Sequence, residues 1–174
     1  MAERRELSFA DLGEAVAEVD RLLAGYVTVG RWSLGQICNH LGTAFRLQLD
    51  GNPGPTPVRR AREALRVRFF RMGRFPDGVE VPLPALLPGP GLDDLAEADA
   101  LREAIARFLS APGPFPPHPV LGPLTRDEWT RFHGRHAAHH LGFALPRTSP
   151  DGDDSQPGTV RNEPAPPKEA GPAS

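Results

Sequence analysis

The chain has 174 residues, of which 39% are hydrophobic, so it has room for one domain with a sizeable core. Its formal net charge of −2 gives no general attraction to nucleic acid or to an anionic membrane surface, and we expect neither as a partner. The single cysteine, Cys38, excludes an internal disulfide and a cysteine-based zinc site, and we interpret it as a small core residue. The N-terminus is charged and no stretch approaches about 18 apolar residues, which favours a cytoplasmic protein.

The first predicted helix begins at Ser8, with Asp11 three residues later in a capping-box arrangement. Gly25 and Gly30 mark its end. Apolar residues recur along it at spacings of three and four over about five turns, which is typical of a helix that packs one face inward. These residues are Phe9, Leu12, Val16, Val19, Leu23 and Tyr26.

A second helix is predicted from Ser33, which has capping-box spacing to Gln36. His40 lies on the flank of its inward face, where it can lean toward a neighbouring helix as a ligand or serve as a structural residue. That face consists of Leu34, Ile37, Leu41, Phe45 and either Gln48 or Leu49.

Turn residues predict a loop at 50–57, and a helix with seven arginines follows within residues 59–74. Such a run is typical of a solvated helix face. The alternative is an anion-binding wall, because guanidinium groups bind carboxylates and phosphates with two parallel hydrogen bonds. Arg62 and Arg66, one turn apart, are the candidate pair for holding an anionic cofactor.

Two proline-rich connections flank the next helix. Residues 75–91 contain five prolines, which exclude a regular helix or a central strand and predict a long crossover loop. The negative charges of Asp93 and Asp94 favour a helix start there, and we expect that helix to end near Ser110. The second connection carries His118, which we interpret as a loop residue that supports the core.

The chain changes character after Leu145. Residues 147–174 are rich in Pro, Gly, Asp, Glu and Ser and have too little apolar surface to offset the entropy of ordering. We therefore predict a single domain at residues 1–146 and a disordered tail at 147–174. No run of alternating polar and apolar residues indicates a sheet.

The last predicted helix, residues 125–143, carries four of the six histidines and begins at a capping box formed by Thr125 and Glu128. At about 100° per residue, His136 and His140 fall within its apolar stripe and should point into the core. His133 and His139 fall to either side, where each can support a metal ligand through a hydrogen bond or reach water. The apolar stripe also contains Trp129, Phe132 and Phe143.

Two interpretations of the inward histidines remain open. A buried histidine is commonly a hydrogen-bonded core residue, whereas two at this spacing can share a metal ion about 2.0–2.1 Å from each. Ala137 stands where a zincin protease needs its catalytic glutamate, which argues against that class. Four amphipathic helices can form a bundle, in which His40 could join His136 and His140. Three neutral imidazoles leave an open position, as in catalytic zinc sites.

Two motifs in the chain resemble a known superfamily. Residues 32–41 read WSLGQIxxHL, and residues 136–140 read HxxHH, which together resemble the DinB-like proteins. Residues 118–129, HPVLGPLTRDEW, and the following HAAHHLGF are similar to one branch, the domain of unknown function 1569. The resemblance covers roughly residues 8–145. It implies an all-α, four-helix bundle with up-down-down-up topology and a divalent metal held by three histidines, which correspond to His40, His136 and His140.

The resemblance also implies a range of functions, because similar proteins include S-transferases and isomerases that use mycothiol, bacillithiol or glutathione. The leading hypothesis is a metal-dependent thiol S-transferase or isomerase in detoxification, in which a metal lowers the pKa of a bound thiol. Zinc or nickel is favoured as the metal, although imidazole also suits iron and copper. Arg62 or Arg66 would hold an anionic cofactor, and the partner would be a small-molecule substrate or thiol.

Two alternatives stay open. The first is a metal-dependent hydrolase, which needs a general base that the inward stripe of the last helix does not supply. The second is a non-catalytic bundle that binds a small ligand or a protein partner, which a fourth ligand from His133 or His139 would favour. A homodimer is compatible with each hypothesis.

Overall fold

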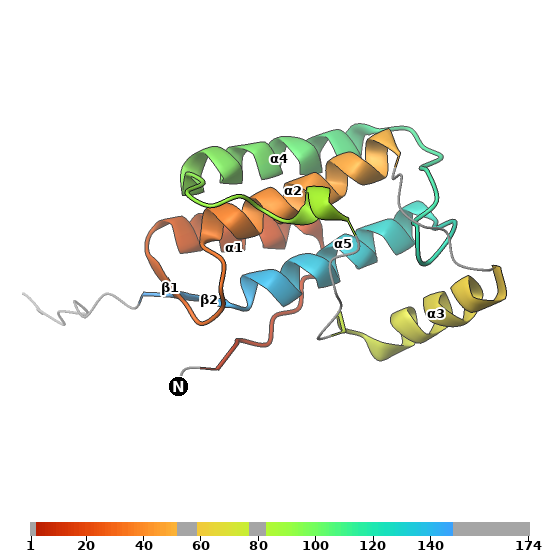
Figure 1. Ribbon diagram of the computed structural model, residues 1–174, viewed down its shortest axis with the longest axis horizontal. Helices are drawn as coiled ribbons and strands as arrows, with labels where there is room; N and C mark the ends of the chain where they lie inside the picture. Colours follow the sequence, from red (N-terminus) through yellow and green to blue (C-terminus); the bar gives the residue numbers. More distant parts are fainter. Residues whose placement is uncertain (1–2, 52–58, 77–82, 148–174) are drawn as a thin grey trace, which may run out of the picture.

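A computed structural model of the chain describes residues 3–51, 59–76 and 83–147. The predicted tail beyond Arg147, most of the predicted loop at 50–57 and residues 77–82 of the predicted crossover lie outside the described residues. Within them the chain is mostly helical, with five α-helices, one 3₁₀-helix and a small sheet (Figure 1). The elements are α1 (Leu12–Leu23), β1 (Tyr26–Thr28), α2 (Leu34–Asp50), α3 (Arg59–Met72), η1 (Pro84–Leu86), α4 (Asp94–Ser110), α5 (Arg126–Leu141) and β2 (Ala144–Pro146).

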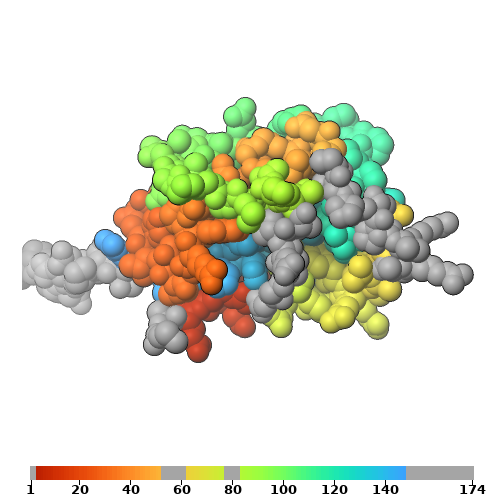
Figure 2. Space-filling view, in the orientation of Figure 1, coloured from red at the N-terminus to blue at the C-terminus, as the bar shows by residue number. Residues whose placement is uncertain are grey.

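Helices α1, α2, α4 and α5 enclose the main core. Helix α4 runs alongside α2, and α5 crosses beneath them between α1 and α3 (Figure 1). Little of α5 reaches the surface on the face shown in Figure 2, where it appears as a blue strip beside the red N-terminal segment. Nine of the 16 residues of α5 are buried, so the helix that carries four histidines is largely interior. The largest side chains sealed in this core are Leu12, Leu22, Leu34, Ile37, Phe108, His133 and Leu141.

The first helix begins later than its sequence pattern predicted. Helix α1 starts at Leu12, because Asp11 rather than Ser8 has the extended cap conformation and accepts a 3.0 Å bond from the Glu14 backbone N–H. The Glu14 carboxylate in turn accepts a 2.7 Å bond from the backbone N–H of Ala10. The predicted start at Ser8 is wrong, since two acceptable cap residues stood three positions apart and the more C-terminal one is used.

The capping boxes of the two histidine-bearing helices are confirmed. At α2, the Ser33 hydroxyl accepts from the Gln36 backbone N–H at 3.2 Å, and the Gln36 side chain accepts from the Ser33 N–H at 3.0 Å. At α5, Thr125 and Glu128 make the same reciprocal pair at 3.2 and 2.9 Å. Because both starts are fixed in this way, the direction in which each later side chain points along α2 and α5 is fixed as well.

The start of α2 is also tied to the start of α4. The Asp94 carboxylate accepts a 2.6 Å bond from the Gly35 backbone N–H and a 2.8 Å bond from the Tyr26 hydroxyl. That hydroxyl accepts in turn from the Leu34 N–H at 3.0 Å. A side chain at Gly35 would begin only 2.9 Å from both Asp94 and the Leu92 carbonyl, so this approach requires glycine.

A two-stranded sheet joins the ends of α1 and α5, which the sequence did not predict. Strand β1 pairs antiparallel with β2, in the register Tyr26 to Pro146 and Thr28 to Ala144. Each strand has three residues, which is too short to show the alternation by which strands are recognised in a sequence. The expectation that the chain has no sheet is therefore wrong.

Cys38 is a core residue, as predicted. Its side chain is fully buried, and burial, reinforced by the nearby Asp94, raises the pKa of the thiol to about 12. A thiol with so high a pKa is not a ready nucleophile.

Helix α3 lies at the edge of the molecule, against the N-terminal half of α5 (Figure 1). Phe69 is its buried anchor and packs on Phe132 at 5.6 Å between ring centroids. Arg135 of α5 donates to the Phe69 carbonyl at 3.0 Å, where the last turn of a helix leaves carbonyls without intrahelical partners. These contacts place the segment after α3, including Phe75, beside α5.

Candidate metal centre

Three histidines meet at the seam between α2 and α5. His40 comes from α2, and His136 and His140 come from adjacent turns of α5. One ring nitrogen from each lies within 4.8 Å of the others, and their ring centroids are 4.5 to 4.9 Å apart. His40 and His136 are buried and His140 is partly exposed. The structure thus brings together the three residues that the sequence singled out as metal ligands.

The protonation pattern of His40 leaves one of its nitrogens free to bind a cation. Its Nδ1 lies 2.6 Å from the Leu86 carbonyl oxygen of η1. A carbonyl can only accept, so Nδ1 carries the proton and Nε2 presents its lone pair. Metal-binding histidines typically donate their second N–H to such an acceptor, which fixes tautomer and ring orientation.

The lone pair of His40 points at His136. The two Nε2 atoms are 2.9 Å apart, so Nε2 of His136 donates to Nε2 of His40. His136 Nδ1 is then buried with no hydrogen-bond partner among the described residues. A buried acceptor without a partner, such as this Nδ1, is unfavourable. The proton between the two Nε2 atoms occupies the place that a cation bound to both nitrogens would take.

The residues fit a divalent transition metal. Two nitrogens bonded at 2.0–2.1 Å to one tetrahedral ion are about 3.3 Å apart, close to the 2.9 Å observed between His40 and His136. Neutral imidazoles suit zinc and nickel, as well as iron and copper.

Burial keeps the three imidazoles neutral. It lowers the pKa of His136 well below the usual value, and the neighbouring histidines add to this effect. It lowers the pKa of His140 to about 2, again with a contribution from His40. The pKa of His40 is lowered by burial as well, although its bond to the Leu86 carbonyl opposes the shift. Neutral imidazole is the form that binds metal ions, so protons compete with a metal only in acid.

Aromatic rings hold the histidines in place. The Trp32 ring stacks on His140 at 5.3 Å and 19°, and lies 4.9 Å from the His40 ring. The Phe75 ring stacks on His136 at 4.7 Å and 23°. Leu86, Phe75 and Trp32 were not predicted from the sequence as parts of the site. Only Trp32 had a usable signal there, since it directly precedes the cap of a histidine-bearing helix.

Comparison with models of protein families assigns the chain to one family. The family model described as "Protein of unknown function (DUF1569)" matches residues 1–147. The chain belongs to this family. Comparisons with curated proteins and with solved structures give no match. The family match agrees with the similarity noted in residues 118–129 and the histidine motif, and the three converging histidines lie within the matched part of this DUF1569 chain.

The other two histidines of α5 do not join the cluster. His133 is 1% exposed and stacks on Phe45 of α2 at 3.7 Å and 15°. The expectation that it can reach water is wrong, because α5 is covered on that side as well. Nδ1 of His139 is 3.0 Å from Nη1 of Arg4, in the N-terminal segment. Neither is part of the group that converges on His40.

His118 supports the core from its loop, as predicted. Its Nδ1 accepts bonds from the backbone N–H groups of Val120 at 3.1 Å and Leu121 at 3.0 Å. Its ring lies 4.8 Å from that of Phe132, and burial lowers its pKa to about 4. It is therefore a neutral acceptor that holds a turn together, and it is not one of the converging histidines.

The two candidate arginines differ in their surroundings. Arg66 donates twice to one oxygen of Glu128, from Nε at 3.0 Å and from Nη2 at 2.8 Å. Nε of Arg62 is buried with no partner among the described residues. Arg66 is thus engaged within the protein, whereas Arg62 retains an unused donor. Binding of an anionic cofactor by either residue stays a prediction.

Glu128 is a buried acidic residue on α5, beside the inward stripe that carries His136 and His140. It is 9% exposed. Burial raises its pKa, but the bonds from Thr125 and Arg66 outweigh this and lower the pKa overall. It lies eight residues before His136, about 12 Å along the helix. This carboxylate therefore caps the helix and pairs with Arg66, at a distance from the histidines.

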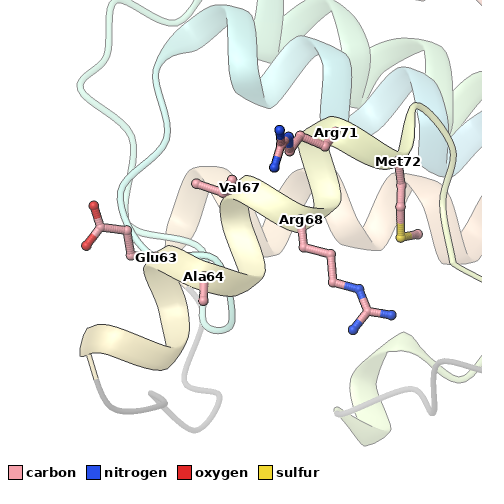
Figure 3. Close-up of a pocket in the computed structure, with 6 residues that line it drawn as sticks. All are labelled: Glu63, Ala64, Val67, Arg68, Arg71 and Met72. Carbon is pink, nitrogen blue, oxygen red and sulfur yellow. The ribbon is translucent and has the colours of Figure 1, made fainter.

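The outward face of α3 is solvated. A hollow along it is lined by Glu63, Ala64, Val67, Arg68, Arg71 and Met72, and the side chain of Arg68 extends away from the helix (Figure 3). Arg68 and Arg71 are exposed. The interpretation of the arginine run as a solvated face is confirmed for these two residues.

No helix in the described part of the chain is both long and apolar enough to cross a bilayer.

Proposed function

We propose that this DUF1569 protein is a metal-dependent enzyme of the DinB-like kind, in which His40, His136 and His140 hold a divalent cation, zinc or nickel. Helices α1, α2, α4 and α5 would form its four-helix bundle, with up-down-down-up topology. The reaction would be transfer or isomerisation at the sulfur of a low-molecular-weight thiol. The proposal depends on one observation, the convergence of three neutral imidazoles with the tautomer of His40 set by Leu86.

An open coordination position favours catalysis over a purely structural role. Among the described residues the group of potential ligands has three members, all histidines. His133 stacks on Phe45, and Nδ1 of His139 is within hydrogen-bond distance of Arg4, so neither has the contacts expected of a fourth ligand. Three protein ligands with a fourth position left for water or substrate are the pattern of catalytic zinc sites.

The protein side of such a reaction is positioning and exclusion of water. A bound divalent cation supplies one effect, a lowered pKa for a thiol that coordinates it. Leu86 holds the proton of His40 away from the centre, and Trp32 and Phe75 cover two of the imidazoles with apolar rings. Arg62 is the better candidate for an anionic cofactor, because Arg66 already has a carboxylate partner.

Metal-dependent hydrolysis has less support. It requires a general base within hydrogen-bond reach of a bound water. The buried carboxylate of α5, Glu128, is about 12 Å along the helix from His136 and is paired with Arg66.

The first experiment is elemental analysis of untagged protein, with circular dichroism as a check on the fold. We expect about one metal ion per chain in the wild type, and loss of the metal in His136→Ala and in His140→Ala. His139→Ala is the matched control, because it removes a histidine of the same helix that lies outside the converging group, and it should retain the metal. A wild type that binds no metal after reconstitution with zinc or nickel would refute the proposal.

The second experiment tests thiol binding with cobalt-substituted protein. Coordination of a thiol changes the ligand field, so the visible spectrum should shift when glutathione, mycothiol or bacillithiol is added. A loaded site whose spectrum responds to none of these thiols would leave a non-catalytic metal-binding bundle as the better description.

A further inference from the structure

A hollow beside α5 is separate from the candidate metal centre. Residues of the N-terminal segment 4–9, of the stretch 73–75 after α3 and of α5 line it, and its volume is about 360 Å³. This size is within the range of small-molecule sites, roughly 300–1,000 Å³. None of the three converging histidines, which all belong to the described chain, lines the hollow.

The N-terminal wall of the hollow is held in place by the rest of the domain. The backbone N–H of Arg5 donates to the Gly142 carbonyl at 2.9 Å. The Arg5 guanidinium donates to the Glu18 carboxylate at 2.5 Å and to the Ala144 carbonyl at 2.6 Å. These bonds keep the N-terminal segment beside α5 (Figure 1). The hollow is therefore already formed without a ligand.

Positive charge dominates the walls of the hollow. One acidic residue, Glu6, is among the described lining residues. The charge of Arg5 is already compensated by its ion pair with Glu18. The arginines that line the hollow are Arg4, Arg5, Arg74, Arg131 and Arg135.

Two of these arginines crowd each other without an acidic partner. Arg131 and Arg135 are one turn apart on α5, and their guanidinium carbons lie 5.0 and 5.6 Å from the centroid of the same ring, Phe70. No ion pair within the described residues includes either arginine. Like charges at this spacing on a helix are unfavourable. The pair therefore presents positive charge that an anion would stabilise.

Arg135 carries the larger penalty, because it is partly buried. Burial lowers its pKa, and the charge of Arg131 lowers it further. Arg135 donates from Nη1 to the Phe69 carbonyl at 3.0 Å and from Nη2 to the Phe70 carbonyl at 3.4 Å. These bonds use two of the five N–H groups of the guanidinium and leave its charge uncompensated.

The chemistry of the walls indicates a class of ligand. Guanidinium groups bind carboxylates and phosphates with parallel hydrogen bonds, and two positive charges match a ligand with two negative ones. Phe9 and Phe75 add apolar surface that suits a short carbon skeleton. We propose that this hollow binds a small organic dianion, either a phosphate monoester or a dicarboxylate. Neither Arg62 nor Arg66 lines it, so this site differs from the one expected for an anionic cofactor, and it does not depend on a bound metal.

The test is a titration of the metal-free full chain with glycerol 3-phosphate and, separately, with succinate, at constant ionic strength. Backbone amide signals of lining residues such as Ser8, Gly73 and Ala138 should shift saturably in ¹H–¹⁵N spectra. The signal of Gly91, which does not line the hollow, should stay in place. We expect a dissociation constant between about 0.1 and 10 mM for the better ligand. Tighter binding in one arm than in the other identifies the anionic group that the site prefers.

Three controls make the test specific. Arg131→Gln removes one of the two charges at an exposed position and should weaken binding about 10-fold, the effect of losing one charge-assisted hydrogen bond. Arg68→Gln removes the same charge from the outer face of α3, outside the hollow, and should change the affinity by less than about two-fold because solvent and salt screen it. Glycerol, which carries no charge, should shift none of these signals.

The outcomes are distinct. Absence of saturable shifts with both dianions would overturn the site. Equal losses of affinity in Arg131→Gln and Arg68→Gln would overturn it as well, because they would show a general attraction to the positive surface. Since the titration uses metal-free protein, a wild type that binds no metal would refute the proposed function and leave the dianion site standing.

Discussion

Two groups of histidines occupy the same interior and behave differently. His40, His136 and His140 present their nitrogens to one another. His133 stacks on Phe45, and His118 binds two backbone N–H groups of its own loop. Burial lowers the pKa in both groups. A low pKa and burial therefore do not distinguish the candidate metal ligands from the other buried histidines, whereas the convergence of their ring nitrogens does.

The difference arises from what α2 presents to α5. His133 and His136 are one turn apart on the same helix, and each faces a ring of α2. Opposite His133 that ring is Phe45, and opposite His136 it is His40, five residues earlier in α2. The same residue type thus becomes a packed ring at one point and a potential ligand at the next. We call these two places the packing end and the ligand end of the seam.

The largest expected effect comes from making the ligand end resemble the packing end. His40→Phe replaces one ligand by the residue type that faces His133, and metal affinity should fall on the order of 100-fold. This follows from about 10–16 kcal/mol for a four-ligand zinc site, which is roughly 3 kcal/mol per ligand. Competition with a chromogenic chelator measures the affinity. Unchanged affinity in a folded variant would show that His40 is not a ligand.

Substitutions of His133 test the packing end. His133→Ala should destabilise the protein by about 3 kcal/mol, because it leaves a ring-sized cavity at a fully buried position. His133→Phe should cost little, since it keeps the stacked ring and removes Nε2, which has no partner among the described residues. Urea unfolding gives both values.

Metal affinity supplies the control for this pair. It should be the same in His133→Phe and in the wild type, because His133 lies outside the converging group. A large loss of metal in His133→Phe would remove the distinction between the two ends.

The part of the site that could be predicted from the sequence depends on local rules. Capping boxes at Ser33 and Thr125 fix where α2 and α5 begin, and helical periodicity then places His40, His136 and His140 toward the interior. Periodicity alone did not decide the side on which His133 lies, because α5 is covered on more than one side. The helix interior is wider than a single stripe, and only the neighbouring helices define it.

Features made by distant residues were not predictable in this way. The Leu86 carbonyl that orients His40 comes from a proline-rich segment 46 positions away. The sheet pairs two three-residue strands that are far apart in the sequence, at residues 26–28 and 144–146. Near the N-terminus the local rules were ambiguous, since Ser8 and Asp11 are both suitable caps and the helix uses Asp11.

The pH dependence of stability probes His118, which like His133 is buried outside the three converging histidines. Its folded pKa of about 4 is below the unfolded value of 6.5, so the unfolded chain binds the proton first. Its contribution is fully present above pH 6.5 and is lost as the pH falls toward 4. The loss reaches about 3 kcal/mol, at 1.36 kcal/mol per pKa unit. His118→Asn keeps an acceptor for the two backbone N–H groups but cannot titrate, so its stability should fall less over this range in urea unfolding of metal-free protein. Equal slopes for the two proteins would show that His118 is not buried as a neutral group.

The smallest expected effect is at the contact between α3 and the start of α5, beyond the packing end. Arg66→Ala removes two hydrogen bonds to Glu128 and should lower the free energy of unfolding by about 1 kcal/mol, because the arginine is 40% exposed and its ion pair is screened. Arg68→Ala, on the outer face of the same helix, is the matched control and should stay within about 0.5 kcal/mol of the wild type. Since Glu128 is about two turns from His136, neither variant should change metal affinity. A loss of metal in Arg66→Ala alone would mean that the start of α5 and the ligand end are coupled, and the seam would then act as one unit.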